Sequence, residues 1–128
     1  MTTLTIRARG TATADEVWDR YADVRRWTEW APQIRRVDAG GTTLRAGLSG
    51  TVRPVVGPGV RFVVEDVDDD ARTWAWRVRL GPVGLVRMHL VHGVEADGST
   101  WLRVTGLLPV VAGYLPLARF ALGRLVKA

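Results

Sequence analysis

The chain has 128 residues, of which 47% are apolar and 24% are charged. This length and balance are typical of one soluble globular domain, and they exclude a disordered chain and a second catalytic domain. The absence of cysteine from the sequence excludes disulfides, thiolate nucleophiles and cysteine-ligated metals. We therefore expect a single domain over residues 1–128, as a monomer or a small homo-oligomer.

The formal net charge is +5, and arginine supplies almost all of the positive charge, because Lys127 is the only lysine. A basic chain invites a nucleic-acid interpretation. The arginines are scattered along the chain, however, and so strong a preference for arginine over lysine is typical of a GC-rich genome. Since a basic surface is not in itself a binding site, we predict no nucleic-acid partner.

The first residues, Met1-Thr-Thr-Leu-Thr-Ile-Arg, lack the apolar segment of a secretory signal. The longest uncharged stretch, residues 104–118, contains two prolines and is shorter than the ~20 residues that cross a bilayer. The sequence therefore predicts a cytoplasmic protein without stable membrane insertion.

Residues 3–9 alternate between apolar and polar side chains, which predicts a half-buried strand. A Thr-x-x-Glu capping box that begins at Thr13 predicts a helix over about residues 14–21. A second short helical stretch carries Trp27 and Trp30, three residues apart on one face. Two short helices are thus expected after the first strand.

Short alternating segments fill residues 34–108, and turn residues such as Gly40-Gly41, Gly81-Pro82 and Asp97-Gly98 separate them. No helical pattern of 10–15 residues intervenes, so about six strands are expected to pair as an antiparallel meander. Residues 116–127 then have the pattern of an amphipathic helix. The predicted fold class is α+β: a curved antiparallel sheet of about seven strands, covered by a C-terminal helix.

The alternation assigns one face of this sheet to the interior. Trp76 and Met88 belong to the inner rows, whereas Arg77 and Arg87 belong to the outer rows. Large apolar residues with a few polar groups among them are typical of a ligand pocket, but a solid core uses the same residues. The pattern alone leaves both interpretations open.

The run from Ala12 to Pro32 resembles the opening of the START-like (SRPBCC) superfamily, especially its bacterial polyketide cyclase/dehydrase and lipid-transport group. Members of that group show a valine-tryptophan pair in the first helix, an aspartate that closes it, and a Trp-x-x-Trp before a proline. In this sequence those residues are Val17-Trp18, Asp23, Trp27 and Trp30.

This resemblance implies the helix-grip fold, in which a curved sheet wraps the C-terminal helix around a hydrophobic cavity. It also implies the binding or carrying of a hydrophobic small molecule, such as a lipid, a polyketide or an aromatic compound. Because the same fold serves enzymes, a polyketide cyclase or dehydratase is the alternative. The chain ends soon after Leu125, where many relatives continue their helix, so the closure of the pocket stays an open question.

Within this framework the inner rows and the resemblance predict a set of ligand-binding residues. The set comprises Trp30, Phe62, Val64, Trp76, Val78, Met88, Leu90, His92, Leu102, Val104 and Tyr114. Tyr114, which is expected just before the last helix, either points its hydroxyl into the pocket mouth or packs as a plain core residue.

His92 is the only imidazole in the inner rows and is the candidate catalytic residue, as an acid or a base. The alternative is a buried structural histidine that hydrogen-bonds its neighbours. His89 has the opposite parity, so the two histidines cannot share a metal. No metal is expected, and no cofactor is expected either, because the glycines lack a phosphate-binding motif.

Overall fold

Seven strands form one antiparallel sheet in the order β1-β7-β6-β5-β4-β3-β2. The computed structural model describes residues 1–80 and 86–128; the turn predicted at Gly81-Pro82 lies outside them. The strands are β1 (Thr2–Ala8), β2 (Ile34–Ala39), β3 (Ser49–Pro54), β4 (Val60–Asp68), β5 (Thr73–Leu80), β6 (Val86–Val94) and β7 (Thr100–Gly106).

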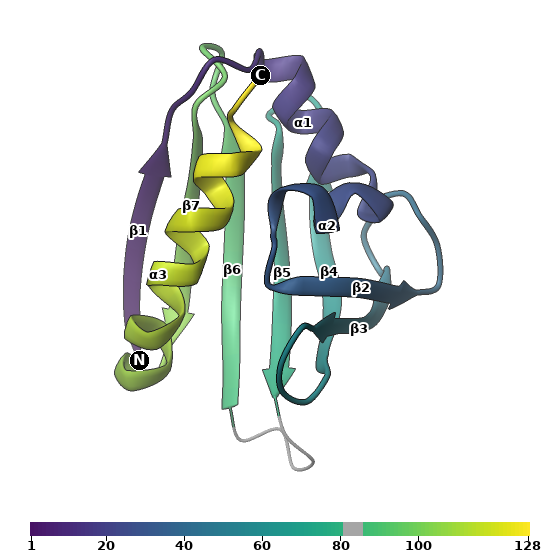
Figure 1. Cartoon of the computed structure of the whole chain (residues 1–128), viewed down its shortest axis with the longest axis vertical. Coiled ribbons are helices and arrows are strands. Elements are labelled where there is room, and N and C mark those ends of the chain that lie inside the picture. Colours follow the sequence, from purple (N-terminus) through teal and green to yellow (C-terminus); the bar gives the residue numbers. More distant parts are fainter. Residues whose placement is uncertain (81–85) are drawn as a thin grey trace.

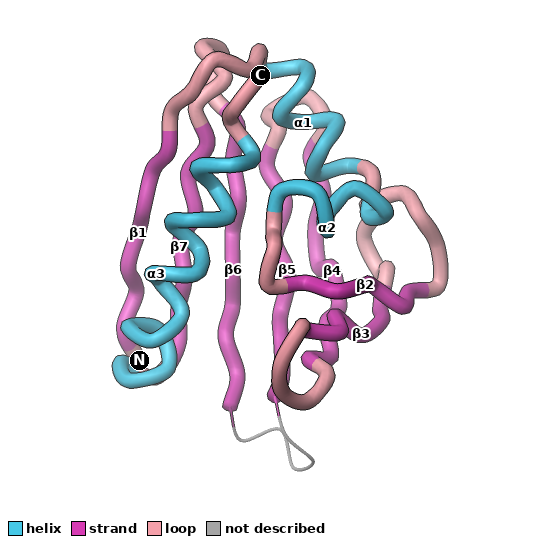
Figure 2. Tube along the Cα trace, viewed as in Figure 1, coloured by secondary structure: helices cyan, strands magenta, loops and turns pink. Residues whose placement is uncertain are grey.

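The helices are α1 (Ala14–Ala22), the 3₁₀ turn η1 (Val24–Arg26), α2 (Trp27–Trp30) and α3 (Leu108–Leu125). Figure 1 shows α1, α2 and α3 in front of the sheet, and β2 and β3 running across β4 and β5, so the sheet is strongly curved. In Figure 2 the helices and the strands β2 and β3 lie on the same side of the rest of the sheet. This arrangement is the helix-grip fold.

The last helix begins earlier than the sequence pattern predicts. It spans Leu108–Leu125 rather than residues 116–127, so Tyr114 lies inside α3 and not before it. Pro109 stands in the first turn, where a helix needs no backbone N–H, and Pro116 is accommodated in the helix interior. The apolar stripe that faces the sheet outweighs the missing hydrogen bond; its buried residues are Val111, Ala118, Ala121, Leu122 and Leu125.

Strand alternation assigns the two faces of the sheet as predicted. Trp76 and Leu90 are buried, and Met88 is half-buried, whereas Arg77 and Arg87 are exposed. One irregularity interrupts β4, where the pairing with β5 shifts between residues 64 and 66. A bulge adds one residue to one strand, so the side chains beyond it point to the face opposite to the one that strict alternation predicts.

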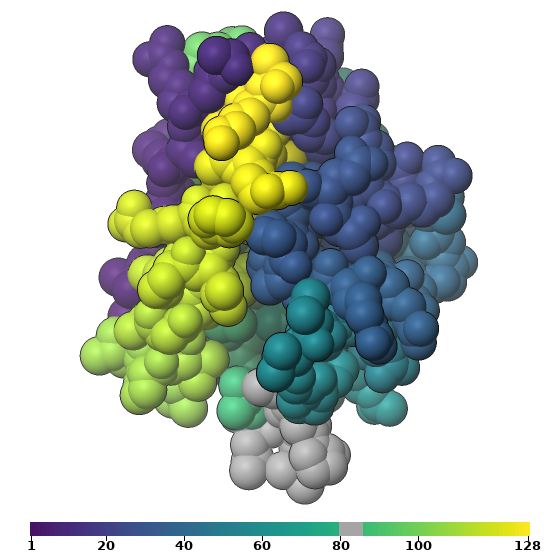
Figure 3. Space-filling model, in the orientation of Figure 1, coloured from purple at the N-terminus to yellow at the C-terminus, as the bar shows by residue number. Residues whose placement is uncertain are grey.

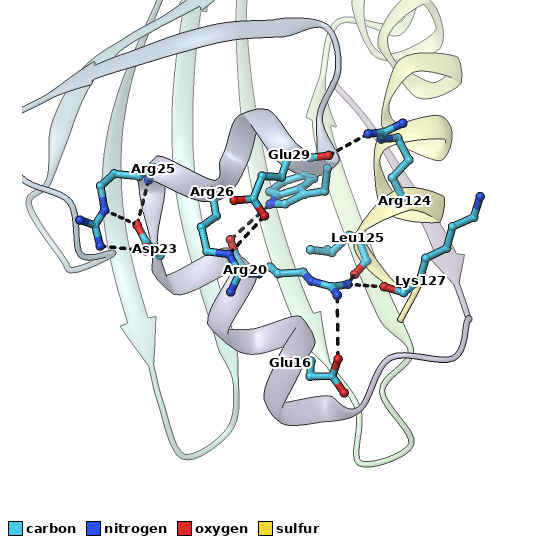
Figure 4. Close-up of polar contacts among 10 residues, drawn as sticks. Glu16, Arg20, Asp23, Arg25, Arg26, Glu29, Arg124, Leu125 and Lys127 are labelled. Atoms are coloured by element: carbon cyan, nitrogen blue, oxygen red, sulfur yellow. Dashed lines mark hydrogen bonds and ion pairs between the residues drawn. The ribbon is translucent and has the colours of Figure 1, made fainter.

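Polar contacts fix the C-terminal end of α3 to the first two helices (Figure 4). Arg20 of α1 donates to the backbone carbonyls of Leu125 and Lys127. Arg124 of α3 donates to the carbonyl of Glu29 in α2 over 2.9 Å. Because arginine satisfies carbonyls that have no partner within the helix, these contacts hold the end of α3 against α1 and α2.

An aromatic cluster forms the centre of the core. Trp27 of α2 stacks on Trp74 of β5, with 5.5 Å between ring centroids. Tyr21 of α1 meets Trp74 edge-on at 5.6 Å, and Phe62 of β4 meets Trp76 in the same way. Such pairs stabilise by about 0.5–1.5 kcal/mol each beyond the burial of their area, so the aromatic cluster anchors α1 and α2 to β4 and β5.

Candidate functional site

A large apolar cavity lies between the inner face of the sheet and α3. Its volume is about 540 Å³. The strands β5 and β6 supply one wall, and α3 and the segments around β2 and β3 supply the others. The lining residues are Gln33, Ile34, Val52, Pro54, Val55, Val56, Val60, Trp76, Val78, Val86, Met88, Leu90, Val110, Tyr114 and Leu117.

The cavity reaches the protein surface at one end. Val55 and Val56, in the connection between β3 and β4, are 59% and 87% exposed, and Leu117 of α3 is 50% exposed, yet all three line the cavity. Figure 3 shows the surface hollowed between α3 and the β3–β4 connection. A ligand therefore has an entrance edged by apolar side chains.

A smaller chamber of about 40 Å³ adjoins the cavity on the side of the aromatic cluster. Its lining includes His92, Trp74 and Leu102 from the sheet, Trp30 from α2, and apolar residues of α3. Four residues line both spaces, so the chamber is the inner continuation of the cavity; they are Gln33, Ile34, Trp76 and Tyr114.

Most of the predicted ligand-binding residues meet in these two spaces. Trp76, Val78, Met88, Leu90 and Tyr114 line the cavity, and Trp30, His92 and Leu102 line the chamber. The remaining three lie in the packed core, where Phe62 is 4%, Val64 1% and Val104 0% exposed, and they line neither space.

Sequence reasoning missed the residues that connections and the first half of α3 contribute. Gln33, Val55 and Val56 belong to connections without a periodic pattern, and Val110 lies in the part of α3 that the prolines concealed. The exposed pair Val55-Val56 is the one signal that could have revealed the mouth, because exposed neighbouring apolar residues mark binding sites.

His92 lies at the centre of a chain of hydrogen bonds. It pairs with Trp74 in the β5–β6 register, and their rings stack at 4.4 Å with 8° between the planes. The Nε1–H of Trp76 donates to His92 Nε2 over 3.0 Å. On the other side His92 Nδ1 lies 3.2 Å from the hydroxyl of Tyr21.

Thr100 sets the donor and acceptor roles in the hydrogen bonds between His92, Tyr21 and Thr100. The hydroxyl of Thr100 donates to the carbonyl of Gly93 over 2.8 Å, so it accepts the 2.7 Å bond from Tyr21. The Tyr21 oxygen then accepts from His92 Nδ1–H. His92 is therefore the neutral tautomer with its proton on Nδ1, since Nε2 is already an acceptor.

Burial keeps the His92 imidazole neutral. His92 is 3% exposed, and burial lowers its pKa from 6.5 to about 3, because a charged imidazolium is poorly solvated in an apolar interior. Both ring nitrogens have protein partners. In this arrangement His92 has neither a free nitrogen nor a pKa near neutrality with which to exchange protons.

Two other donors remain without a partner in the described part of the chain. Trp74 Nε1 is buried and makes no hydrogen bond there. Tyr114 makes none with a described residue, and burial raises its pKa to about 12, so its hydroxyl stays protonated. Both side chains line the 40 Å³ chamber.

The described lining of both spaces contains no lysine, arginine, aspartate or glutamate. Within residues 1–80 and 86–128, no group of three histidine, cysteine or acidic side chains is placed to hold a metal ion. The described lining thus makes the site an uncharged, largely apolar space.

The fold and this internal cavity define a protein of the helix-grip class. The family described as polyketide cyclase/dehydrase and lipid transport matches residues 1–128. The chain belongs to this family. No curated protein sequence matches it.

Solved structures of similar shape support the fold assignment. The crystal structure of Ara h 8.0201 has a TM-score of 0.74 and 10% identity, over 98% of this chain and 95% of that chain. The protein XoxI from Bacillus cereus has a TM-score of 0.76 and 13% identity, over 98% and 93%. The di-domain ARO/CYC BexL, from the BE-7585A biosynthetic pathway, has a TM-score of 0.75 and 18% identity, over 98% of this chain and 45% of BexL.

None of the described helices is both long and apolar enough to cross a membrane.

Proposed function

We propose that the protein binds or carries a hydrophobic small molecule, such as a lipid, a polyketide or an aromatic compound, in the cavity between the sheet and α3. The observation that carries this proposal is the space itself: about 540 Å³ lined almost entirely by apolar side chains. Ligand pockets typically enclose about 300–1,000 Å³ with an apolar lining and few polar groups.

The proposed role of His92 is structural rather than catalytic. Its neutral ring accepts a hydrogen bond from Trp76 Nε1–H and donates one to the Tyr21 hydroxyl. Trp76 also forms part of the cavity wall. His92 thereby fixes the orientation of a side chain that touches the ligand. A network in which every buried donor and acceptor is satisfied is rigid, so it preorganises the cavity.

A fluorescent neutral dye tests the proposal. Nile red should bind stoichiometrically to the parent, and Val78→Trp, which fills the cavity, should weaken binding at least tenfold while the protein stays folded. Val63→Trp is the matched control, because Val63 is 40% exposed on the outer face of β4. Overpacking a solid core typically costs about 1–3 kcal/mol, whereas filling an open cavity costs less.

Two results would contradict the proposal. One is that the parent binds no apolar probe. The other is that Val78→Trp and Val63→Trp bind the dye equally well, which would place the dye outside the cavity.

Polyketide cyclisation or dehydration is the second candidate function. The similarity to BexL and the Tyr114 hydroxyl, which bonds no described residue, favour it, because a protonated phenol on a residue that lines the chamber can act as a general acid. A general acid or base typically contributes about 10²–10⁴ in rate. We expect no turnover of a polyketide-like substrate by the parent; turnover above buffer that is abolished in Tyr114→Phe or His92→Gln would establish an enzyme instead.

A further inference from the structure

The outer face of the sheet carries three arginines in register. Arg61 of β4 lies directly opposite Arg79 of β5, and Arg79 lies directly opposite Arg87 of β6. All three side chains are exposed. Like charges that stand directly opposite each other destabilise a sheet. Because proteins break such local rules mainly at functional sites, this arginine row (Arg61, Arg79 and Arg87) is a candidate binding surface.

No carboxylate neutralises the arginine row. None of the ion pairs in the described part of the chain includes one of its members. Glu65 of β4 pairs instead with Arg77 and His89. The five other residues of the chain, Gly81-Pro-Val-Gly-Leu, include no acidic side chain. The three positive charges are thus available to an anion from outside the chain.

The arginine row lies at the same end of the molecule as the cavity mouth. Each of its members directly follows a valine that lines the cavity; these valines are Val60, Val78 and Val86. Figure 1 shows the β3–β4 connection, the start of α3 and the ends of β4, β5 and β6 that carry the row together at the lower end of the molecule. The cations and the entrance for a ligand therefore share one end.

Exposed apolar side chains gather at this end too. Val55 and Val56 edge the entrance from the β3–β4 connection, and Leu107 and Leu108, at the start of α3, are each 55% exposed. Exposed apolar groups beside polar ones mark protein or membrane contacts. This apolar rim (Val55, Val56, Leu107 and Leu108) and the arginine row together match a surface that presents hydrocarbon next to negative charge.

We propose that this end of the molecule docks on the surface of an anionic phospholipid bilayer, with the apolar rim at the boundary of headgroups and acyl chains and the arginine row on the lipid phosphates. The inference rests on the proposed function, because it makes the membrane the place where the cavity exchanges its hydrophobic ligand. Arginine suits the contact, since its planar guanidinium binds phosphate in a bidentate manner and its long stem reaches along apolar surface.

Other occupants fit this end less well. A second copy of the chain would bring like charges together. An acidic protein would neutralise the arginines, but a bilayer neutralises them, buries the apolar rim and also dissolves hydrophobic compounds. The combination of charge, apolar rim and cavity mouth therefore favours the bilayer.

Sedimentation of the full chain with two kinds of vesicle tests the inference. One kind is phosphatidylcholine alone, and the other contains equal amounts of phosphatidylcholine and phosphatidylglycerol. The parent should bind the anionic vesicles at least about tenfold more tightly than the neutral ones, because each arginine near an anionic surface contributes about fivefold in affinity. Added salt should reduce this preference.

The combined variant Arg61→Gln, Arg79→Gln, Arg87→Gln should lose affinity for the anionic vesicles by about 100-fold, from about fivefold for each arginine. It should stay folded, because all three side chains are exposed and their removal relieves like-charge repulsion. Its binding of Nile red in the absence of vesicles should equal that of the parent, because none of the three residues lines the cavity.

Two further variants separate a located surface from general charge. The combined variant Arg9→Gln, Arg25→Gln, Arg45→Gln removes the same net charge from exposed positions outside the row, and it should lose no more than about threefold in affinity for the anionic vesicles. Val56→Ser, in the apolar rim, should weaken binding to them by at least about threefold. Val63→Ser, at an exposed position on the outer face of β4, should not.

Equal binding of the parent to neutral and anionic vesicles, or equal losses in the two triple-arginine variants, would overturn the inference. So would a parent that binds soluble polyglutamate through the arginine row but not the anionic vesicles, which would indicate an acidic protein as the partner. In each case Nile red would still bind the parent without vesicles, and the proposed function would stand. If Nile red did not bind the parent, the proposed function itself would fail.

Discussion

The buried histidine predicts a specific dependence of stability on pH. In the folded protein His92 is neutral, and burial lowers its pKa from 6.5 to about 3. In the unfolded chain the imidazole is solvated and takes up a proton near pH 6.5. Below that pH the unfolded state therefore binds one proton more than the folded state, and the free energy of unfolding falls as the pH falls.

The size of the effect follows from the two pKa values. The contribution is fully present above pH 6.5, and it is lost progressively down to about pH 3. Each pH unit within this window costs about 1.4 kcal/mol. Between about pH 7.5 and about pH 4.5 the loss is therefore about 3 kcal/mol, a large part of the roughly 5–15 kcal/mol that stabilises a typical domain.

Urea unfolding at these two pH values measures the loss directly. His92→Gln lowers stability at both, because it disturbs the bonds to Trp76 and Tyr21, but the fall of about 3 kcal/mol on acidification should disappear. His89→Gln, which changes the half-buried histidine beside Glu65 on the outer face, should retain most of it. If the parent and His92→Gln lost equal stability on acidification, the neutral buried imidazole would be refuted.

Two paired substitutions test other contacts of the fold by the same unfolding measurement. Arg20→Ala should cost about 2–3 kcal/mol, because it removes the donor to the Leu125 and Lys127 carbonyls. Arg26→Ala removes only a solvent-exposed ion pair and should cost about 1 kcal/mol or less. Equal costs would refute the role of Arg20 in holding the end of α3. Thr100→Val should cost about 1–3 kcal/mol, because it leaves the Tyr21 hydroxyl without its acceptor. Thr105→Val, which removes an exposed Thr–Thr hydrogen bond, should cost less than about 1 kcal/mol. The reverse order of costs would contradict the hydrogen-bond directions assigned around His92.

The sheet is predictable from the sequence because its signal is local. The side-chain period of two fixes which residues of a strand face inward, and this period alone assigns Trp76, Val78 and Leu90 to the cavity side. The order of motifs from Val17-Trp18 to Trp30 then indicates the family, and with it the curvature that turns an inner face into a cavity wall.

The parts that sequence reasoning missed depend on contacts between distant residues. Tyr21 and His92 are 71 positions apart, so nothing local reveals that the imidazole is neutral and fully bonded. The start of α3 was hidden because Pro109 and Pro116 are helix breakers in isolation, whereas burial against the sheet decides here. The packed positions Phe62 and Val64 differ from cavity positions only through what the helices place opposite them.

In the same way, nothing in the sequence indicated that the Nε1–H of Trp74 bonds no acceptor among the described residues. Its partner across the sheet, His92, has a nitrogen at each end of its ring, and only the structure shows that Trp76 and Tyr21 occupy both. Whether a buried donor is satisfied is a property of the assembled core and not of any sequence window.

Native mass spectrometry of the protein isolated from its own host, without detergent, tests the central claim most directly. The account predicts a second species at a 1:1 ratio, heavier by the mass of one uncharged hydrophobic compound, that is absent from Val78→Trp and present in Val63→Trp. A parent that carries no ligand and binds no added apolar compound, or a bound mass that Val78→Trp retains in full, would contradict it.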